Sequence, residues 1–212
     1  MPADGAQDEC PYVSRGGLKM EHALREFGLD PSGMVCADLG ASTGGFTDCL
    51  LRHGAASVYA VDTAYGEFAW RLRNDPRVVV MERSNALHAA PPKQVSDAGG
   101  VDLVVIDLGW TRQRHAIPAA LRWMKPGGLI ITLIKPHYEV GESGARVGET
   151  VLAEEEARAI TDRVVSEMPM LGVRAVAVTR SPVLGGSVGA KRKKKGTGNA
   201  EWLVLLERTE SG

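Results

Sequence analysis

The sequence predicts an α/β protein with an open, doubly wound sheet. An apolar stretch at residues 34–37 leads into an acid and a glycine-rich turn at 40–45, after which a helical pattern begins. A near-continuous apolar stretch at 101–110 is typical of a central parallel strand that is covered on both faces. Strand-like and helix-like segments alternate along most of the chain, as a parallel α/β sheet requires.

The first half of the chain supplies elements with recognisable ends. A helical pattern starts near Leu18 and stops at Gly28, a residue type common at helix ends. Strands are expected at 57–62 and 78–81. A helix is expected at 67–74, with Phe68, Leu72 and Trp70 toward the sheet. Residues 91–100 contain prolines and glycines and are expected to form a loop.

The second half continues the same alternation. We expect a helix at 116–124, a strand at 129–136, a glycine-containing loop at 137–147 and an amphipathic helix at 150–168. Strands at 173–178 and 201–207, joined by a loop at 185–199, complete a set of seven.

Length and composition place the chain among ordinary globular domains. It has 212 residues, 44% hydrophobic and 24% charged, which is enough for one domain with a real core. We expect a flexible segment at 1–11 followed by a single domain at 12–212. The formal net charge of −1 gives no overall basic field, so nucleic-acid contacts must come from local patches.

The cysteines and the chain start indicate a reduced compartment. Three cysteines without a C-x-x-C pair predict free thiols, with no disulfide framework and no metal site. No stretch reaches membrane-spanning length and no signal pattern precedes the domain, so a cytoplasmic protein is expected.

The glycine-rich turn predicts a cofactor site. The spacing G-A-S-T-G-G differs from the G-x-G-x-x-G of dinucleotide sites, and Asp38 precedes the turn by two residues. An acid at this point suits a ligand with a cationic end, which favours S-adenosylmethionine (SAM) over NAD. The candidate contacts here are Asp38, Gly40, Ala41, Ser42, Thr43, Gly44, Gly45 and Phe46.

Polar residues at later strand ends extend this site. Asp62 could accept hydrogen bonds from ribose hydroxyls of SAM or NAD, or merely cap the next helix. Asn85 carries the amide needed to recognise adenine, although turn propensity also explains it. Asp107 ends the central strand and is expected beside the ligand crevice. Trp110 could stack on a base or simply close the pocket, and packing is the expected role.

Basic residues form a third group of candidates. Lys135 follows an apolar strand and therefore needs a carboxylate partner or a depressed pKa. Lys19 lies early in the first helix, where a lysine is by default a surface residue. The run Lys191, Arg192, Lys193, Lys194 and Lys195 lies between glycines and is either a solvated patch or a contact to a phosphate backbone.

Several of these residues carry a resemblance to a known family. The segments are Ser14-Arg15-Gly16-Gly17-Leu18-Lys19, residues 38–48, Asp107, Ile134-Lys135-Pro136 and Gly198-Asn199-Ala200-Glu201. They resemble the FtsJ-like RNA 2′-O-methyltransferases, and the first two segments especially resemble the TlyA (haemolysin-A-like) rRNA methyltransferase branch. The resemblance extends from about Tyr12 to Glu207.

The resemblance implies a fold, a cofactor and a catalytic set. The fold would be a Rossmann-like class I SAM-dependent methyltransferase, with a seven-stranded, mostly parallel sheet, an antiparallel last strand and helices on both faces. A Lys-Asp-Lys-Glu tetrad would fall on Lys19, Asp107, Lys135 and Glu201. The substrate would be RNA, expected to be ribosomal, with Arg15 and the basic run as contacts.

Two differences from the TlyA branch stand out. That branch carries an S4-type RNA-binding domain for which this chain leaves no room, so a protein partner or the ribosomal particle is expected to supply affinity. It also has Ser-Phe where this chain has Gly109-Trp110, which alters the expected substrate pocket.

The tetrad suggests two roles for Lys135. Burial and the nearby Lys19 cation are expected to lower its pKa, so that it acts as a general base on the 2′-hydroxyl. Alternatively, it stays a cation that steers the hydroxyl and stabilises negative charge.

Three rival functions share parts of this pattern. A methyltransferase for base amines would show prolines after Asp107, and a nicotinamide oxidoreductase would show a different glycine spacing. A non-catalytic RNA-binding or ribosome-assembly factor could retain the fold, but the intact tetrad argues against it.

Overall fold

The computed structural model describes residues 10–140, 151–185 and 198–209. Three predictions therefore lie mostly or wholly outside the described residues: the segment 1–11 apart from Cys10 and Pro11, the loop 137–147 beyond Val140, and the basic run 191–195. Within the described ranges, no helix combines the length and apolar character needed to cross a bilayer.

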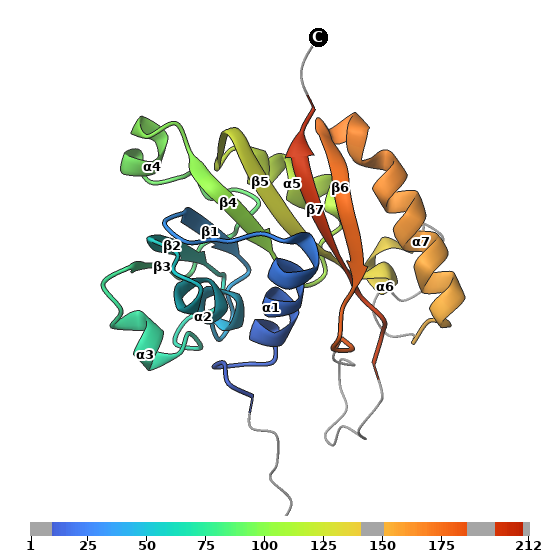
Figure 1. Cartoon of the computed structure of the whole chain (residues 1–212), viewed down its shortest axis with the longest axis horizontal. Coiled ribbons are helices and arrows are strands. Elements are labelled where there is room, and N and C mark those ends of the chain that lie inside the picture. The colour runs from blue at the N-terminus through green and yellow to red at the C-terminus, as the bar shows by residue number, and fades with distance from the viewer. Residues whose placement is uncertain (1–9, 141–150, 186–197, 210–212) are drawn as a thin grey trace, which may run out of the picture.

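One seven-stranded sheet organises the described chain, in the order β3-β2-β1-β4-β5-β7-β6 (Figure 1). β7 pairs antiparallel with β5 and β6, whereas the pairs from β3 through β5 are parallel. The predicted mostly parallel sheet with an antiparallel last strand is confirmed. The strands are β1 Val35–Leu39, β2 Ser57–Val61, β3 Val78–Met81, β4 Val101–Ile106, β5 Met124–Ile134, β6 Val173–Arg180 and β7 Trp202–Arg208.

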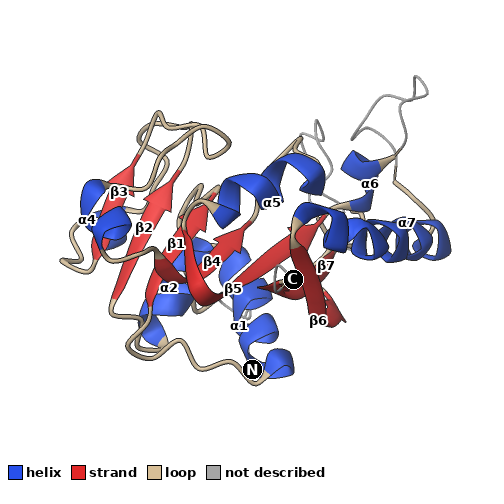
Figure 2. Ribbon diagram, turned by 90° about the horizontal axis from the view of Figure 1, so that it is seen from above, coloured by secondary structure: helices blue, strands red, loops and turns tan. Residues whose placement is uncertain are grey.

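Helices cover both faces of this sheet (Figure 2). One face is covered by α1 (Gly16–Phe27), α2 (Gly45–Arg52) and the short α3 (Trp70–Arg73), which pack onto the sheet through an apolar core that includes Phe46. The other face is covered by α4 (Lys93–Asp97), α5 (Gln113–Leu121), α7 (Glu154–Glu167) and the 3₁₀ turn η1 (Met168–Leu171), which pack onto the sheet through an apolar core that includes Trp123. Because both faces are covered, the central strands are apolar on both sides.

Four local expectations need correction. Residues 91–100 contain α4, because Pro92 precedes its first turn and Val95 packs onto the sheet. The helix expected at 67–74 is shorter in the structure, where only α3 is helical, since the N–H of Ala69 donates to the carbonyl of Thr43 in the glycine turn. Trp70 then points outward and is 75% exposed.

The other two corrections concern the segments around β5. β5 begins at Met124, which pairs with Val101 before an irregularity in the ladder. The loop expected from His137 opens with the short helix α6 (Pro136–Glu139).

The strand order fixes where a ligand can lie. From β1 the chain continues to β2 on one side, while β4 pairs with β1 on the other. In open α/β sheets, the crevice at the carboxyl ends of such strands is the usual ligand site. Gly40 follows β1 and Asp107 follows β4, so both lie at this crevice.

Candidate active site

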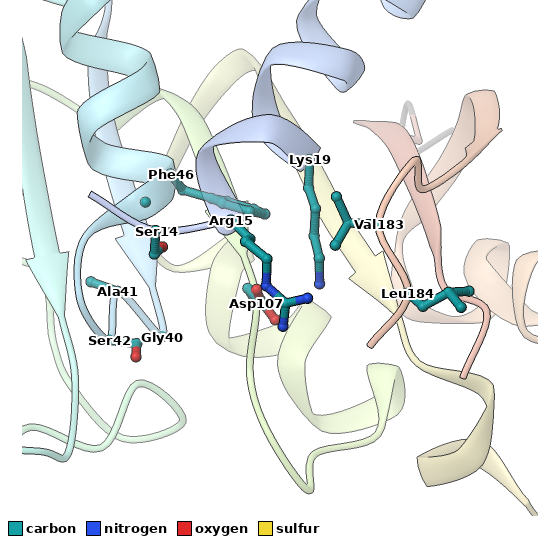
Figure 3. A pocket seen from close by; sticks show the side chains of 12 residues that line it. Ser14, Arg15, Lys19, Gly40, Ala41, Ser42, Phe46, Asp107, Val183 and Leu184 are labelled. Atoms are coloured by element: carbon teal, nitrogen blue, oxygen red, sulfur yellow. The ribbon is translucent and has the colours of Figure 1, made fainter. Parts of the chain in front are cut away.

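Two adjoining cavities open at the carboxyl ends of β1 and β4. The larger has a volume of about 560 Å³, and its lining includes Asp62, Asn85 and Lys135. The smaller, of about 210 Å³, is lined by Arg15 and Lys19 among others (Figure 3). Gly40, Ser42 and Asp107 belong to both linings, so the two cavities meet at these residues.

The glycine turn is shaped by the neighbouring strands. The N–H groups of Gly40 and Ala41 both donate to the carbonyl of Val61 at the end of β2, at 2.9 and 3.1 Å. Gly40 has φ +95°, and a Cβ there would lie 2.7 Å from the carbonyl oxygen of Asp107. A side chain is therefore excluded both by conformation and by space.

The predicted contacts of the turn divide into two groups. Ala41, Gly45 and Phe46 line the smaller cavity, together with the shared Gly40 and Ser42. Thr43 and Gly44 line neither of the two cavities. Gly44 instead faces Phe68 and Leu72, where a Cβ would collide with the side chains that pack α3.

Asp38 lies behind the turn rather than in a cavity. It is fully buried and accepts hydrogen bonds from both the N–H and the hydroxyl of Thr47, at 3.1 and 2.7 Å. Its other oxygen, Oδ1, has no partner in the described residues. Burial raises the pKa of Asp38 to about 7, against the opposing effect of the Thr47 hydrogen bonds. The side chain of Asp38 therefore ties β1 to the first turn of α2.

Asp62 and Asn85 both line the larger cavity but also hold its walls together. Asp62 accepts the N–H groups of Ser42 and Ala64, each at 2.7 Å. Each carboxylate oxygen keeps a further lone pair that a ribose hydroxyl could use. The side-chain oxygen Oδ1 of Asn85 accepts the N–H of Leu87, so Asn85 stabilises a turn and lines the cavity at the same time.

The four predicted tetrad residues form two ion pairs, and three of them, Lys19, Asp107 and Lys135, line the cavities on either side of their junction. Lys135 Nζ lies 2.5 Å from Asp107 Oδ1, and Lys19 Nζ lies 2.5 Å from Glu201 Oε2. The Lys19 and Glu201 side chains are only 10% and 3% exposed, so Lys19 is not the surface residue expected by default. The four residues come from α1 and from the ends of β4, β5 and β7, far apart along the chain.

The charges of each ion pair also shift the pKa values of residues in the other pair. Burial raises the pKa of Asp107, but the Lys135 and Lys19 cations together bring it below its ordinary value. Burial raises the pKa of Glu201, and Lys19 only partly offsets this.

For Lys135 the expected direction is wrong. Burial lowers its pKa, but the carboxylates of Asp107 and Glu201 together raise it by a larger amount. The net pKa of Lys135 therefore lies above its ordinary value. The resting Lys135 is therefore a cation.

Two further predicted residues stand at the cavity rims. Arg15 is exposed, and its side chain reaches toward the same space as those of Lys19 and Asp107 (Figure 3). Trp110 is 57% exposed and lines the larger cavity, with its ring centroid 5.0 Å from that of Tyr138. Trp110 thus packs against Tyr138 at the cavity rim while more than half of its surface stays exposed, and its backbone turns at φ +56° just after the end of β4.

Sequence reasoning missed several residues of this site. Val183 and Leu184, from the segment after β6, supply an apolar wall of the smaller cavity. His137 is buried beside Tyr138, and burial with the nearby Lys135 and Lys19 cations lowers its pKa to about 4. The only available signal was position, since His137 and Tyr138 directly follow Lys135-Pro136.

Comparison with known proteins gives a consistent result. Residues 12–204 match the family described as FtsJ-like methyltransferase. The chain is 40% identical to 16S/23S rRNA (cytidine-2′-O)-methyltransferase TlyA of Mycobacterium tuberculosis over 204 residues, which are 96% of this chain and 70% of that protein. It is 38% identical to YqxC of Bacillus subtilis over 197 residues, which are 92% of this chain and 65% of that protein.

A solved structure supports the same relationship. A candidate hemolysin from Streptococcus thermophilus superimposes with a TM-score of 0.82 at 34% identity, covering 97% of this chain and 70% of that one. The chain thus spans about two thirds of the length of these relatives. The family match over most of the sequence shows that this chain belongs to the FtsJ-like methyltransferase family, whose cofactor is S-adenosylmethionine.

Proposed function

We propose that this chain transfers a methyl group from SAM to a ribose 2′-hydroxyl of RNA, with ribosomal RNA as the substrate. The observation that carries the proposal is the meeting of Lys19, Asp107, Lys135 and Glu201 as two ion pairs beside the junction of two cavities. Similarity to TlyA, named as an rRNA (cytidine-2′-O)-methyltransferase, supports the choice of substrate.

The larger cavity fits the nucleoside part of the cofactor. Its volume of about 560 Å³ lies within the range of small-molecule sites. Asp62 would bind the ribose hydroxyls and Asn85 the adenine, while the bare backbone at Gly40 would allow close approach. When bound, SAM supplies a methyl group activated by its cationic sulfur.

The tetrad would orient and polarise the attacking hydroxyl. Lys135, held by Asp107, would donate a hydrogen bond to the 2′-oxygen and stabilise negative charge as the oxygen–carbon bond forms and the carbon–sulfur bond breaks. The hydroxyl proton would leave to water at the open end of the cavity. Two cations and two carboxylates balance one another, so the cluster tolerates its partial burial.

Contacts to RNA would come from basic residues around the smaller cavity. Arg15 lines this cavity and presents a guanidinium suited to a phosphate. The basic run at 191–195 lies outside the described residues and is proposed as a second phosphate contact. A ribosomal substrate would place the protein in the cytoplasm and would let the ribosomal particle contribute affinity. Residues 12–212 would act as one domain.

Methyl transfer to defined RNA tests the proposal. Ribosomal RNA, transfer RNA and a protein mixture would each be incubated with radiolabelled SAM, and modified RNA would be mapped by its resistance to alkaline cleavage. We expect ribosomal RNA to be labelled at a 2′-oxygen by the wild-type chain. Lys135→Ala should abolish labelling but retain SAM binding, whereas the control Lys93→Ala, on an exposed part of α4, should behave as wild type.

The result also separates the rival functions. Labelling of a base or of protein would contradict the 2′-oxygen assignment. Binding of both SAM and RNA by the wild-type chain without any transfer would identify a non-catalytic factor.

A further inference from the structure

Glu201 lies between two residues of a small separate apolar cluster. Its neighbours Ala200 and Trp202 are buried against Ala157 of α7, with Leu152 and Leu184 packed alongside. Successive side chains of an extended chain point to opposite sides, so Glu201 points away from this cluster and toward Lys19. The cluster thus fixes the backbone from which the Glu201 carboxylate projects.

Asn199 ties three chain segments together next to that backbone. It is 4% exposed, and its side-chain oxygen accepts the N–H of Leu152, ahead of α7, at 2.8 Å. Its main-chain carbonyl accepts the N–H of Gly185, also at 2.8 Å. The carbonyl of Glu201 in turn accepts the N–H of Ser181. The segments before α7, after β6 and before β7 are therefore held as one unit.

Two glycines bring this unit close to the carboxylate. A Cβ on Gly185 would collide with the side-chain carboxylate of Glu201, and a Cβ on Gly198 would collide with the carbonyl of Gly185. The backbone at Gly185 consequently closes one side of Glu201, while Lys19 occupies another. A shift of this backbone would release the carboxylate from its present direction.

We propose that Asn199 is a positioning residue, which fixes the backbone of Gly185 and Glu201 so that the Glu201 carboxylate meets Lys19. Asn199 itself donates nothing to the reacting atoms. The inference rests on the proposed function only for its effect on methyl transfer, because the geometry of the Lys19–Glu201 pair can be measured without it.

A double-mutant cycle on stability tests the geometric part. The coupling between Lys19→Met and Glu201→Gln would be measured by urea unfolding, in the wild-type chain and in the Asn199→Ala background. We expect the coupling to fall by at least half in that background. The coupling between Lys135→Met and Asp107→Asn should stay unchanged, since that pair is held by other segments.

Two further variants keep the test decisive. Gly185→Ala pushes on Glu201 from the other side and should reduce the same coupling, which covers the case of an Asn199→Ala chain that does not fold. Asn74→Ala is the control, because it removes an asparagine side-chain hydrogen bond outside this unit, the one that Asn74 donates to the carbonyl of Trp70 at the exposed end of α3. An unchanged Lys19–Glu201 coupling in both Asn199→Ala and Gly185→Ala would overturn the proposal.

Kinetics then test the link to the reaction. A displacement of about 1 Å in a positioned group costs roughly 100-fold in rate, so Asn199→Ala should lower kcat by about 10- to 100-fold. The KM values for SAM and RNA should stay within about twofold, because Asn199 lines neither of the two cavities. Asn199→Asp keeps the oxygen that accepts from Leu152 and should recover most of kcat. Loss of coupling with unchanged kcat would refute the role of Glu201 in the proposed function while leaving the geometric inference intact.

Discussion

The backbone N–H of Val13 donates to the carboxylate of Asp48 at 2.9 Å, across 35 residues of sequence. The same carboxylate pairs with Arg52 on α2 and with Arg71 on α3. Asp48 therefore fastens the segment that carries Ser14 and Arg15 onto the two helices beside the glycine turn. The entry to the smaller cavity depends on this attachment.

Replacing Asp48 should destabilise the protein and disturb this entry. Asp48→Ala leaves the N–H of Val13 without its acceptor, and we expect the free energy of unfolding to fall by about 1–3 kcal/mol. Urea unfolding measures this change. Asp30→Ala removes a similar hydrogen bond, to the N–H of Ser32 in an exposed turn, and should cost less than about 1 kcal/mol. Equal losses for the two variants would contradict the role given to Asp48.

A methyl group at Gly40 should block the cofactor. In Gly40→Ala the new Cβ would press on the carbonyl of Asp107, so SAM affinity should fall at least tenfold by titration calorimetry. Gly28→Ala is the control, because Gly28 also has a positive φ of +61° but has open space around it. That control should lose about 1 kcal/mol of stability through backbone strain alone and bind SAM normally. Normal SAM binding by Gly40→Ala would place the cofactor elsewhere.

Asp38 should make stability depend on pH in an unusual direction. Burial raises its pKa in the folded chain to about 7, above its value in the unfolded chain. Such a carboxyl contributes stability at pH values below its unfolded pKa and loses that contribution as the pH rises through its folded pKa.

The variant Asp38→Asn isolates this effect, because its amide does not titrate. Between pH 6 and pH 8, the wild-type chain should lose about 1 kcal/mol of unfolding free energy relative to Asp38→Asn. Parallel stability curves for the two proteins over that range would show that Asp38 is ionised throughout.

The charge of Lys135 should appear in the pH dependence of the rate. Its pKa lies above the ordinary lysine value of about 10.4, so only about one molecule in a thousand or fewer would be neutral at pH 7. If Lys135 acts as a cation, kcat measured at saturating SAM and RNA should stay nearly flat from pH 7 to pH 9. A tenfold rise in kcat for each pH unit would instead indicate a general base.

The sequence was sufficient to predict the sheet and the residues that follow its central strands. The apolar stretches ending in Asp107 and Lys135 could only be buried strands, and parallel strands bring their carboxyl ends to one edge. The helix α4 was hidden because Pro91, Pro92, Gly99 and Gly100 dominate its segment and only Val95 is buried. The prolines and glycines indicated a loop, and the sequence did not show that Val95 packs onto the sheet.

The pairing inside the site could not be obtained from sequence. Nothing in the chain indicates that Lys19 pairs with Glu201, 182 residues away, while Lys135 takes Asp107. The direction of the Lys135 pKa depends on these positions, because burial lowers it while the Asp107 carboxylate at 2.5 Å and the nearby Glu201 carboxylate together raise it by more. The direction of the Asp38 side chain was equally open, since an acid before a glycine turn can face either the ligand or the helix behind it, and here it accepts from Thr47 of α2.

Because Asp107 forms part of the wall of both cavities, occupants of the two cavities would share one carboxylate. Any ligand that changes the charge or orientation of Asp107 changes the affinity of the other cavity. Thermodynamic linkage then requires reciprocity: the factor by which RNA alters the dissociation constant of SAM equals the factor by which SAM alters that of RNA.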